Sequence, residues 1–205
     1  TGGARREAEG VSVFIVDKSS AGISTRDYAT VDGRRASEVY FENVSVPASN
    51  LIGEEGAALP LIELVTDEAI AALCAEACGA MKVAHAQTLE YSKQRKQFGV
   101  PIGKFQVLQH RMVDMYTAYE TAVSMTYLAT LKLGEEEKVR KRHVSATKVS
   151  VGQSARLIGQ DAVQIHGGNG VTDEYQIGHY FKRLTLFDTE FGNIDHHMKR
   201  HVALS

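Results

Sequence analysis

The stretch RKQFGVPIGKFQ, from Arg95 to Gln106, separates two long helical segments of this 205-residue sequence. Gly99, Pro101 and Gly103 disfavour a helix here, because glycine is too flexible and proline lacks the amide hydrogen that a helix needs. The stretch is therefore predicted to be a connector at one end of a helical hairpin. Arg95 falls at the end of the first helix, where a cation is favourable and where a guanidinium can also meet a phosphate.

Apolar residues recur every three or four positions on both sides of this connector, as in amphipathic helices. One helix is predicted from about Glu55 to Lys93, and another from about Lys104 to Leu133, where Gly134 ends it. The apolar positions expected on the first helix are Leu61, Leu64, Val65, Ala69, Ala72, Ala75, Gly79 and Val83. Those expected on the second helix are Val107, Leu108, Met112, Met115, Tyr119, Val123 and Leu131.

Two more helices are predicted in the last third of the chain. The third begins in the acidic run 135–137, which is favourable at a helix N-terminus, and continues to about Ile165. The final helix begins at about Asp188 or slightly later, with Asp188 as its N-cap and Glu190 as an acidic residue of its first turn. Four long helices with short connections are typical of an up-and-down bundle.

The first quarter of the chain is β-rich. The sequence VSVFIVD, from Val11 to Asp17, is apolar on both sides and predicts a strand that is buried on both faces. The stretch from Glu38 to Val44 alternates and predicts a half-buried strand, and Asp32-Gly33 between them is a hairpin signal. These strands are too few for an independent sandwich. The predicted fold class is mainly α, a C-terminal four-helix up-and-down bundle preceded by a partial β domain.

The composition excludes several classes of protein. Lys and Arg number 23 and Asp and Glu 25, so the net charge of −2 argues against a dedicated nucleic-acid binder and a strongly basic membrane-surface protein. No apolar run approaches the roughly 18 residues of a membrane span. Cys74 and Cys78 lie one helical turn apart and are predicted to be buried, reduced side chains, which favours a cytoplasmic location.

A second glycine-rich segment, QIHGGNG, runs from Gln164 to Gly170 at the end of the third helix. Its glycines permit positive φ and let another molecule approach the backbone closely. One interpretation is a helix C-cap followed by a tight turn. The other is a site at which backbone amides and the side chains of Gln164 and Asn169 meet a nucleotide. The segment lacks the Gly-Lys-Ser/Thr ending of a Walker loop.

Two adjacent histidines follow in the segment that leads into the final helix. His196 and His197 point about 100° apart if they lie on a helix, so they cannot readily bind the same metal ion. The sequence therefore predicts no metal site here.

Together these segments resemble the acyl-CoA dehydrogenase family, and the resemblance covers essentially the whole chain. It depends on R-K-x-F-G-x-P-I-G-K-F-Q from Arg95, followed by D-A-V-Q-I-H-G-G-N-G from Asp161. The stretches GVSVFIVD, VDGRRASEVYFENVSVP and LIGEEG look like the second half of that family's middle β domain. Residues 1–53 would then be the remainder of that domain, and residues 54–205 the C-terminal helical-bundle domain.

The resemblance implies a flavoenzyme of about twice this length, of which this chain is a C-terminal fragment. Such enzymes form oligomers with FAD bound between subunits, oxidise an acyl-CoA substrate at its α and β carbons, and pass the electrons to an electron-transfer flavoprotein. By similarity, Arg95 and Gln97 face the FAD pyrophosphate and Phe98 packs beside the cofactor. The residues expected around the adenosine-diphosphate portion are Gln164, Gly167, Gly168, Asn169 and, near the adenine, Gln106.

The sequence departs from the family at the catalytic base, which takes the α proton from the substrate. Alignment on Gly192 puts Phe191 in the place of the usual glutamate. Glu190 is one position away, which turns its side chain by about 100° on a helix. Some relatives carry the base on the first long helix, where Ala69 stands here beside Glu68. Glu190 and Glu68 are the candidates for a base within this chain.

Three hypotheses about function remain open. The chain is part of a catalytic acyl-CoA dehydrogenase that uses Glu190 or Glu68. Alternatively, it is a base-lacking subunit of a hetero-oligomer that completes the partner's FAD site. The tail FGNIDHH resembles such subunits of bacterial enzymes for dicarboxylic or steroid-derived acyl-CoA. The third hypothesis is a flavin-free helical interaction module that uses KVRKRH, Lys138 to His143, to dock an acidic partner, although i,i+4 pairing with the preceding glutamates also explains that run.

Overall fold

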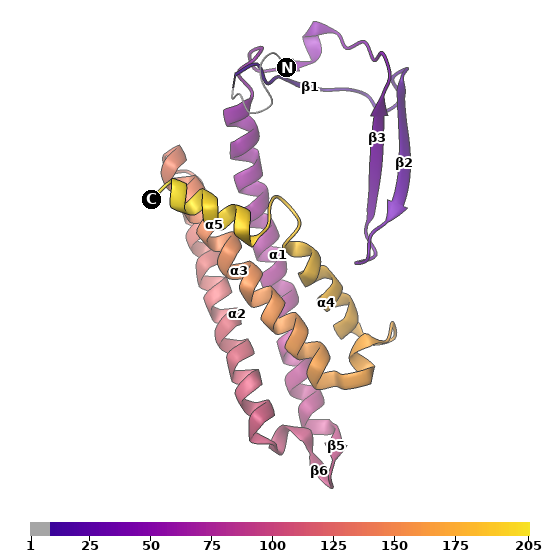
Figure 1. Ribbon diagram of the computed structural model, residues 1–205, viewed down its shortest axis with the longest axis vertical. Helices are drawn as coiled ribbons and strands as arrows, with labels where there is room; N and C mark the ends of the chain where they lie inside the picture. The colour runs from indigo at the N-terminus through magenta and orange to yellow at the C-terminus, as the bar shows by residue number, and fades with distance from the viewer. Residues whose placement is uncertain (1–8) are drawn as a thin grey trace. The chain divides into compact units, whose positions relative to one another are not determined.

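The computed structural model describes residues 9–205 (Figure 1). The chain divides between Thr66 and Asp67 into two compact units. The first unit contains short antiparallel strand pairs, and the second contains most of the helical residues (Figure 1). The predicted fold class, mainly α with a small β part before the helices, is confirmed.

A β-hairpin is the longest pairing in the first unit. Strands β2 (Ile23–Ala29) and β3 (Arg35–Phe41) are antiparallel, and the predicted Asp32-Gly33 turn lies between them with Gly33 at φ 81°. The strand predicted over residues 38–44 thus begins earlier and ends at Phe41. Strand β2 was not predicted, because ISTRDYA is mostly polar and lacks the alternation that marks a half-buried strand.

The burial predicted for this β part is wrong. The strand expected from Val11 to Asp17 shrinks to β1 (Val13–Phe14), which pairs with β4 (Leu51–Ile52). Ile15 is 63% exposed and Phe41 is 64% exposed, so neither strand is buried as expected. The reason is the same for both: each described sheet has only two strands, and an isolated pair has no second layer to cover its apolar side chains.

Three of the predicted helices are confirmed close to their expected bounds. They are α1 (Leu59–Gln94), α2 (Gln106–Lys132) and α3 (Glu137–His166). Helix α3 packs against α2 and against the two shorter helices that follow it, so it lies at the centre of the bundle (Figure 1). Gly152 allows this close packing, because a Cβ there would lie 3.1 Å from the side chain of Ile194.

The end of the chain differs from the prediction. Helix α4 (Gln176–Phe187) was not predicted, and the final helix, α5 (Ile194–Ala203), begins six residues after Asp188. Asn193 is the N-cap of α5, because its Oδ1 accepts the N–H of His196 at 2.9 Å. Asp188 is not the N-cap, although its Oδ1 accepts the N–H of Ile194 at 2.9 Å, and Glu190 precedes the helix rather than lying in its first turn.

The apolar face predicted for α1 is also wrong. Leu61 and Val65 are 41% and 54% exposed, and Ala72, Ala75 and Gly79 are exposed as well. The core side chains of α1 are instead Ile70, Leu73, Cys74, Ala77, Cys78, Met81 and Ala84. Alanine occurs on both faces of this helix, so hydrophobic periodicity could not distinguish the buried face from the exposed one.

Other core predictions hold. Met112 and Met115 of α2 are buried as expected, whereas Leu131 is 76% exposed at the far end of the helix. Cys74 and Cys78 are buried and reduced, and burial raises the pKa of the Cys74 thiol to about 12. Among the helices of residues 9–205, none has both the length and the hydrophobicity needed to cross a bilayer.

Candidate functional site

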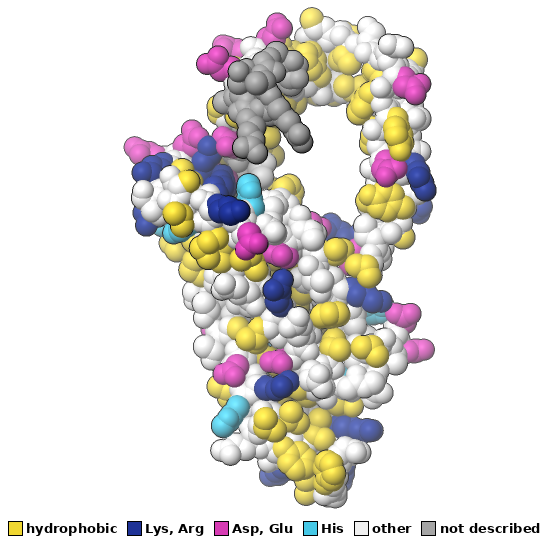
Figure 2. Space-filling model, viewed as in Figure 1, with side chains coloured by type: hydrophobic (Ala, Val, Ile, Leu, Met, Phe, Trp, Pro, Cys, Tyr) yellow, Lys and Arg dark blue, Asp and Glu magenta, His cyan; other side chains and the backbone are white. Residues whose placement is uncertain are grey.

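The connector between α1 and α2 folds as a short hairpin. Strands β5 (Lys96–Gln97) and β6 (Val100–Pro101) pair, and Phe98 forms the tip with a left-handed φ of 55°. Hydrophobic side chains gather at this end of the bundle (Figure 2), and the Phe98 ring is 91% exposed. Its ring meets Phe105 edge-on, with 5.9 Å between the centroids. The hairpin therefore presents an aromatic ring that is open to contact with another molecule.

The QIHGGNG segment forms the second bend, as predicted. Gly167 caps α3 with φ 59°, and its N–H bonds to carbonyls of the last helical turn. The 3-10 helix η3 (Gly167–Val171) follows. Gly170 is required by packing, because a Cβ there would lie 2.8 Å from the Val163 carbonyl. At Gly167 and Gly168 a Cβ would meet nothing within 4 Å, so this backbone is open to close approach.

The two bends line one cavity of about 400 Å³, here called the bend cavity. Gln97 and Phe98 contribute from the hairpin, and Gln164 contributes from the end of α3. The other residues that line it are Ile102, Phe105, Val107, Leu108, Arg111 and Ile165. Two amides, a guanidinium and two aromatic rings are a donor set that suits a planar ring joined to an anionic group.

Arg111 is the member of the bend cavity that the sequence analysis missed. It lies on α2, and its NH1 donates to Oδ1 of Asp161 on α3 at 3.2 Å. Burial raises the pKa of Asp161, and the Arg111 charge partly opposes that shift. Arg111 belongs to no motif. The signal that could have indicated it is a cation within the first two turns of the helix that follows the connector.

Several residues predicted around the cofactor lie outside the bend cavity. They are Arg95, Gln106, Gly167, Gly168 and Asn169. Arg95 is exposed at the end of α1, as predicted, and its N–H bonds to the Tyr91 carbonyl at 2.8 Å. Gln106 is exposed at the start of α2, and Asn169 Nδ2 donates to the Tyr91 hydroxyl at 3.3 Å. A cofactor that contacts these five residues would therefore lie against the exposed surface of the chain, outside the bend cavity.

Two further cavities are present in the helical unit. A mainly apolar one of about 700 Å³ includes His85, Met112 and Tyr116, and it contains none of the predicted site residues. A polar one of about 390 Å³ includes Tyr91 and His166, whose rings stack at 4.3 Å. The larger size of the apolar cavity does not make it the better candidate, because neither of the two motifs contributes a predicted site residue to its lining.

Glu190, one of the two candidate bases, is bound to an arginine. Arg183 of α4 donates to both oxygens of Glu190 at 3.0 Å, and to the oxygens of Glu76 on α1 at 2.7 and 2.8 Å. These bonds raise the pKa of Arg183. Both oxygens of the Glu190 carboxylate are therefore engaged by one guanidinium in a bidentate ion pair. Glu68, the other candidate, is exposed on α1.

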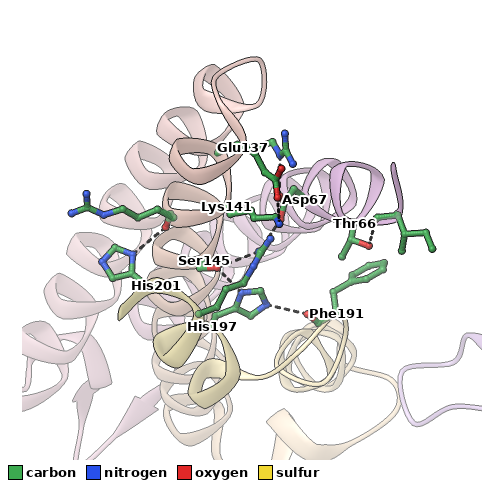
Figure 3. A network of polar contacts seen from close by, with 12 residues as sticks. Thr66, Asp67, Glu137, Lys141, Ser145, Phe191, His197 and His201 are labelled. Atoms are coloured by element: carbon green, nitrogen blue, oxygen red, sulfur yellow. Dashed lines mark hydrogen bonds and ion pairs between the residues drawn. The ribbon is translucent and has the colours of Figure 1, made fainter. Parts of the chain in front are cut away.

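Phe191, in the loop between α4 and α5, is held through its backbone. It has φ 56° and a half-exposed side chain, and its carbonyl accepts a hydrogen bond from His197 Nε2 at 3.0 Å (Figure 3). Nδ1 of His197 then accepts from the Ser145 hydroxyl at 3.2 Å. Burial lowers the pKa of His197 to about 4, so the imidazole is neutral at pH 7. Gly192 adjoins this histidine, with φ 103°.

A buried ion cluster joins α1, α3 and α5 beside this loop (Figure 3). Asp67 is fully buried and accepts from Arg140 Nε at 3.0 Å and from Arg200 NH1 at 2.8 Å. Arg140 lies at the centre of KVRKRH, and Lys141 pairs with Glu137 as the i,i+4 spacing predicts. Burial of Arg140 removes the central arginine of this run from any docking surface, whereas Lys138 and Arg142 are exposed.

A family model described as acyl-CoA dehydrogenase, C-terminal domain, matches residues 64–203. The chain is 32% identical over 188 residues to 2-methylacyl-CoA dehydrogenase, mitochondrial, of Solanum tuberosum, covering 90% of this chain and 45% of that protein. It is 31% identical over 176 residues to the short-chain specific acyl-CoA dehydrogenase of Megasphaera elsdenii, covering 84% and 46%.

A solved structure shows the same fold. The butyryl-CoA dehydrogenase of Megasphaera elsdenii superposes with a TM-score of 0.89 at 26% identity, covering 98% of this chain and 53% of the other. The chain spans about half the length of the relatives that it matches.

Proposed function

Because the chain belongs to the acyl-CoA dehydrogenase family, as its sequence motifs predict, we propose that it is the cofactor-binding C-terminal part of an FAD-dependent acyl-CoA dehydrogenase. The observation that carries this proposal is the bend cavity. The two motifs on which the resemblance depends, far apart in the sequence, contribute Gln97, Phe98 and Gln164 to the wall of one cavity.

The residues of the bend cavity fit part of FAD. The amides of Gln97 and Gln164 can donate to phosphate or adenine, and Phe98 offers a ring beside which a flat group can pack. Arg95, Gln106, Gly167, Gly168 and Asn169 complete the proposed FAD contacts from the exposed surface of both bends, toward a cofactor shared with a neighbouring subunit. When bound, FAD supplies the hydride acceptor for α,β-dehydrogenation of an acyl-CoA thioester.

The wider assignments follow from this proposal. The substrate is an acyl-CoA, the assembly is a homo- or hetero-oligomer, and an electron-transfer flavoprotein takes up the electrons. Residues 1–53 belong to the middle β domain of the whole enzyme and residues 54–205 to its C-terminal bundle. The reduced, buried state of Cys74 and Cys78 supports a cytoplasmic location.

Replacing Gln164 with leucine is expected to weaken FAD binding about fivefold to tenfold, because one hydrogen bond to the cofactor contributes about 1–1.5 kcal/mol. The measurement is titration of the flavin-depleted full-length protein with FAD, followed by flavin fluorescence. Gln153→Leu is the matched control, since Gln153 is exposed on the same helix and outside the cavity. Equal affinity in both variants would remove Gln164 from the site, and no FAD binding by the unmodified protein would refute the proposed function.

A second candidate function is a base-lacking subunit of a heteromeric acyl-CoA dehydrogenase. Two observations favour it over catalysis by this chain alone. The carboxylate of Glu190 is held by Arg183 through two hydrogen bonds, and Phe191 stands where the family's base belongs. In this version the partner subunit supplies the carboxylate, and the present chain completes the FAD site.

Glu190→Gln and Glu68→Gln are each expected to leave substrate-dependent reduction of the flavin within about threefold of normal. A general base contributes about 10²–10⁴-fold to the rate, so loss of the true base is easily recognised. The assay is anaerobic bleaching of the flavin by acyl-CoA in the native assembly. Glu76→Gln is the matched control for Glu190→Gln, because it removes the same charge from the same Arg183 guanidinium. A rate loss of that size in Glu190→Gln, but not in Glu76→Gln, would make Glu190 the base.

A further inference from the structure

The polar cavity that includes Tyr91 and His166 lies where the last turns of α1 meet the start of α4, and it is here called the His166 cavity. Its volume is about 390 Å³, within the range of small-molecule sites. Gln87 Nε2 of α1 donates to Gln176 Oε1 of α4 at 2.8 Å, which joins the two walls. Within residues 9–205 the cavity shares no lining residue with the bend cavity. The residues that line it are Gln87, Glu90, Tyr91, Gln94, His166, Glu174, Tyr175 and Gln176.

His166 is 3% exposed, and one of its two ring nitrogens has no partner. Nδ1 donates to the Ala162 carbonyl at 2.8 Å, and a carbonyl only accepts, so Nδ1 carries the hydrogen. Burial lowers the pKa of His166, so the imidazole is neutral at pH 7 and Nε2 is a bare acceptor. Nε2 is buried and has no hydrogen-bond partner within residues 9–205. Because an unsatisfied buried acceptor is unfavourable, a donor from outside the described chain is expected at this ring.

The lining of the His166 cavity is negatively charged. Within residues 9–205 it contains the carboxylates of Glu90 and Glu174 and neither lysine nor arginine. Gln94 and Lys93 donate to Glu90 and lower its pKa, so this carboxylate is ionised at pH 7. Lys93 lies outside the lining and its side chain is 59% exposed, so water screens its charge. A cation that enters the cavity is therefore favoured.

Three aromatic rings meet beside these carboxylates. Tyr91 and His166 stack with 4.3 Å between their centroids, and Tyr175 lies edge-on to Tyr91 at 6.1 Å. Aromatic rings attract cations and pack well against planar groups. Tyr175 is 39% exposed and 5.5 Å from the His166 ring, so it is the ring that turns aside when a ligand reaches the buried Nε2. The cavity thus suits a group that is flat, positively charged and rich in N–H donors.

We propose that the His166 cavity binds a guanidinium group, which donates to His166 Nε2 and to the carboxylates of Glu90 and Glu174. A substituted guanidinium has only donors, all in one plane, so it matches a bare imidazole nitrogen and two carboxylates. It is more weakly hydrated than an ammonium and stacks on aromatic rings. A metal ion does not fit, because residues 9–205 contain no group of three His, Cys, Asp or Glu side chains that could hold one. The inference does not depend on the proposed binding of FAD.

The test compares methylguanidinium with methylurea, which has the same planar shape but no charge. The full-length protein in its native assembly is titrated with each compound at millimolar concentration, and binding is followed by saturation-transfer NMR. Methylguanidinium is expected to bind at least about tenfold more tightly, because hydrogen bonds between charged groups are about twice as strong as neutral ones.

Two variants locate the site. His166→Phe keeps a ring to stack on Tyr91 but removes the acceptor nitrogen, and Glu174→Gln removes one charge from an exposed position. Each is expected to weaken methylguanidinium binding about fivefold or more, the effect of losing one hydrogen bond to a charged group. His110→Phe and Glu120→Gln are the matched controls, since both residues are exposed on α2 outside the cavity. Circular dichroism checks the fold, and Glu174→Gln decides the outcome if His166→Phe does not fold.

The guanidinium group can belong to a free compound or to an arginine of another chain in the assembly. A free compound is indicated if methylguanidinium binds and both variants weaken it. An arginine of another chain already fills the cavity if methylguanidinium does not bind, while both variants, unlike their controls, weaken subunit association in sedimentation experiments. The proposal is overturned if methylurea binds as tightly as methylguanidinium, if both variants keep the full affinity, or if neither binding nor a change in association is found. FAD titration of the same samples tests the proposed function separately.

Discussion

Replacing Asp67 with alanine is expected to lower the free energy of unfolding by about 3–5 kcal/mol, because it leaves two buried or half-buried arginines without their carboxylate. Asp67 has no exposed surface, and its two oxygens accept from Arg140 at 3.0 Å and from Arg200 at 2.8 Å. Arg140 is 8% exposed, so water cannot readily replace the lost partner. The substitution removes both ion pairs through which Asp67 joins helix α1 to helices α3 and α5.

The measurement is urea-induced unfolding of the native assembly, followed by circular dichroism at a constant protein concentration. Asp173→Ala is the matched control. Asp173 also pairs with a cation, Lys182 at 3.2 Å, but its side chain is 85% exposed, so its loss is expected to cost less than about 1 kcal/mol. Similar small losses in both variants would show that the Asp67 cluster is solvated and contributes little.

Replacing Phe187 with alanine is expected to destabilise the protein by about 3–5 kcal/mol through the cavity that it leaves in the core. Phe187 is 2% exposed, and its ring lies 4.0 Å from the Nζ of Lys148, which is fully buried. The same Nζ donates to the Phe187 carbonyl at 2.6 Å. Burial lowers the pKa of Lys148, and removal of the ring takes away a favourable cation–π contact as well.

Phe98→Ala also replaces a phenylalanine with alanine, but it is expected to affect FAD binding rather than stability. Phe98 is 91% exposed, so the free energy of unfolding is expected to change by less than about 0.5 kcal/mol. FAD affinity is expected to fall, because the exposed ring lines the bend cavity. Urea unfolding and FAD titration on both variants check the contrast. A stability loss in Phe98→Ala comparable to that in Phe187→Ala would contradict the assignment of Phe98 to ligand contact.

Helices were predicted correctly where the apolar repeat in the sequence is long and uninterrupted. Helices α1, α2 and α3 each repeat the apolar pattern over many turns and are separated by glycine or proline, so their bounds were close to the prediction. Helix α4 was missed although Ile177, Leu184 and Phe187 are buried at helical spacing, because only three turns follow a glycine-rich segment. Short signals of this kind are ambiguous in sequence.

The candidate site was predictable where a motif marks it. Gln97, Phe98 and Gln164 lie in such motifs, and the structure brings all three to the bend cavity. Arg111 belongs to no motif. Its place in the cavity depends on the crossing of α2 and α3, which puts it 3.2 Å from a residue 50 positions away in the chain.

From the amino-acid sequence one could read the family, the helical character and the two glycine-containing bends, because each depends on neighbouring residues: backbone freedom, proline geometry and local periodicity. Which face of the alanine-rich α1 is buried, and which cations lie inside, depended on packing. Arg140 looked like part of a solvated basic run, yet it is buried against Asp67, 73 positions earlier. Local patterns do not contain such pairings, since a buried charge is stable only where the fold places its counter-charge beside it.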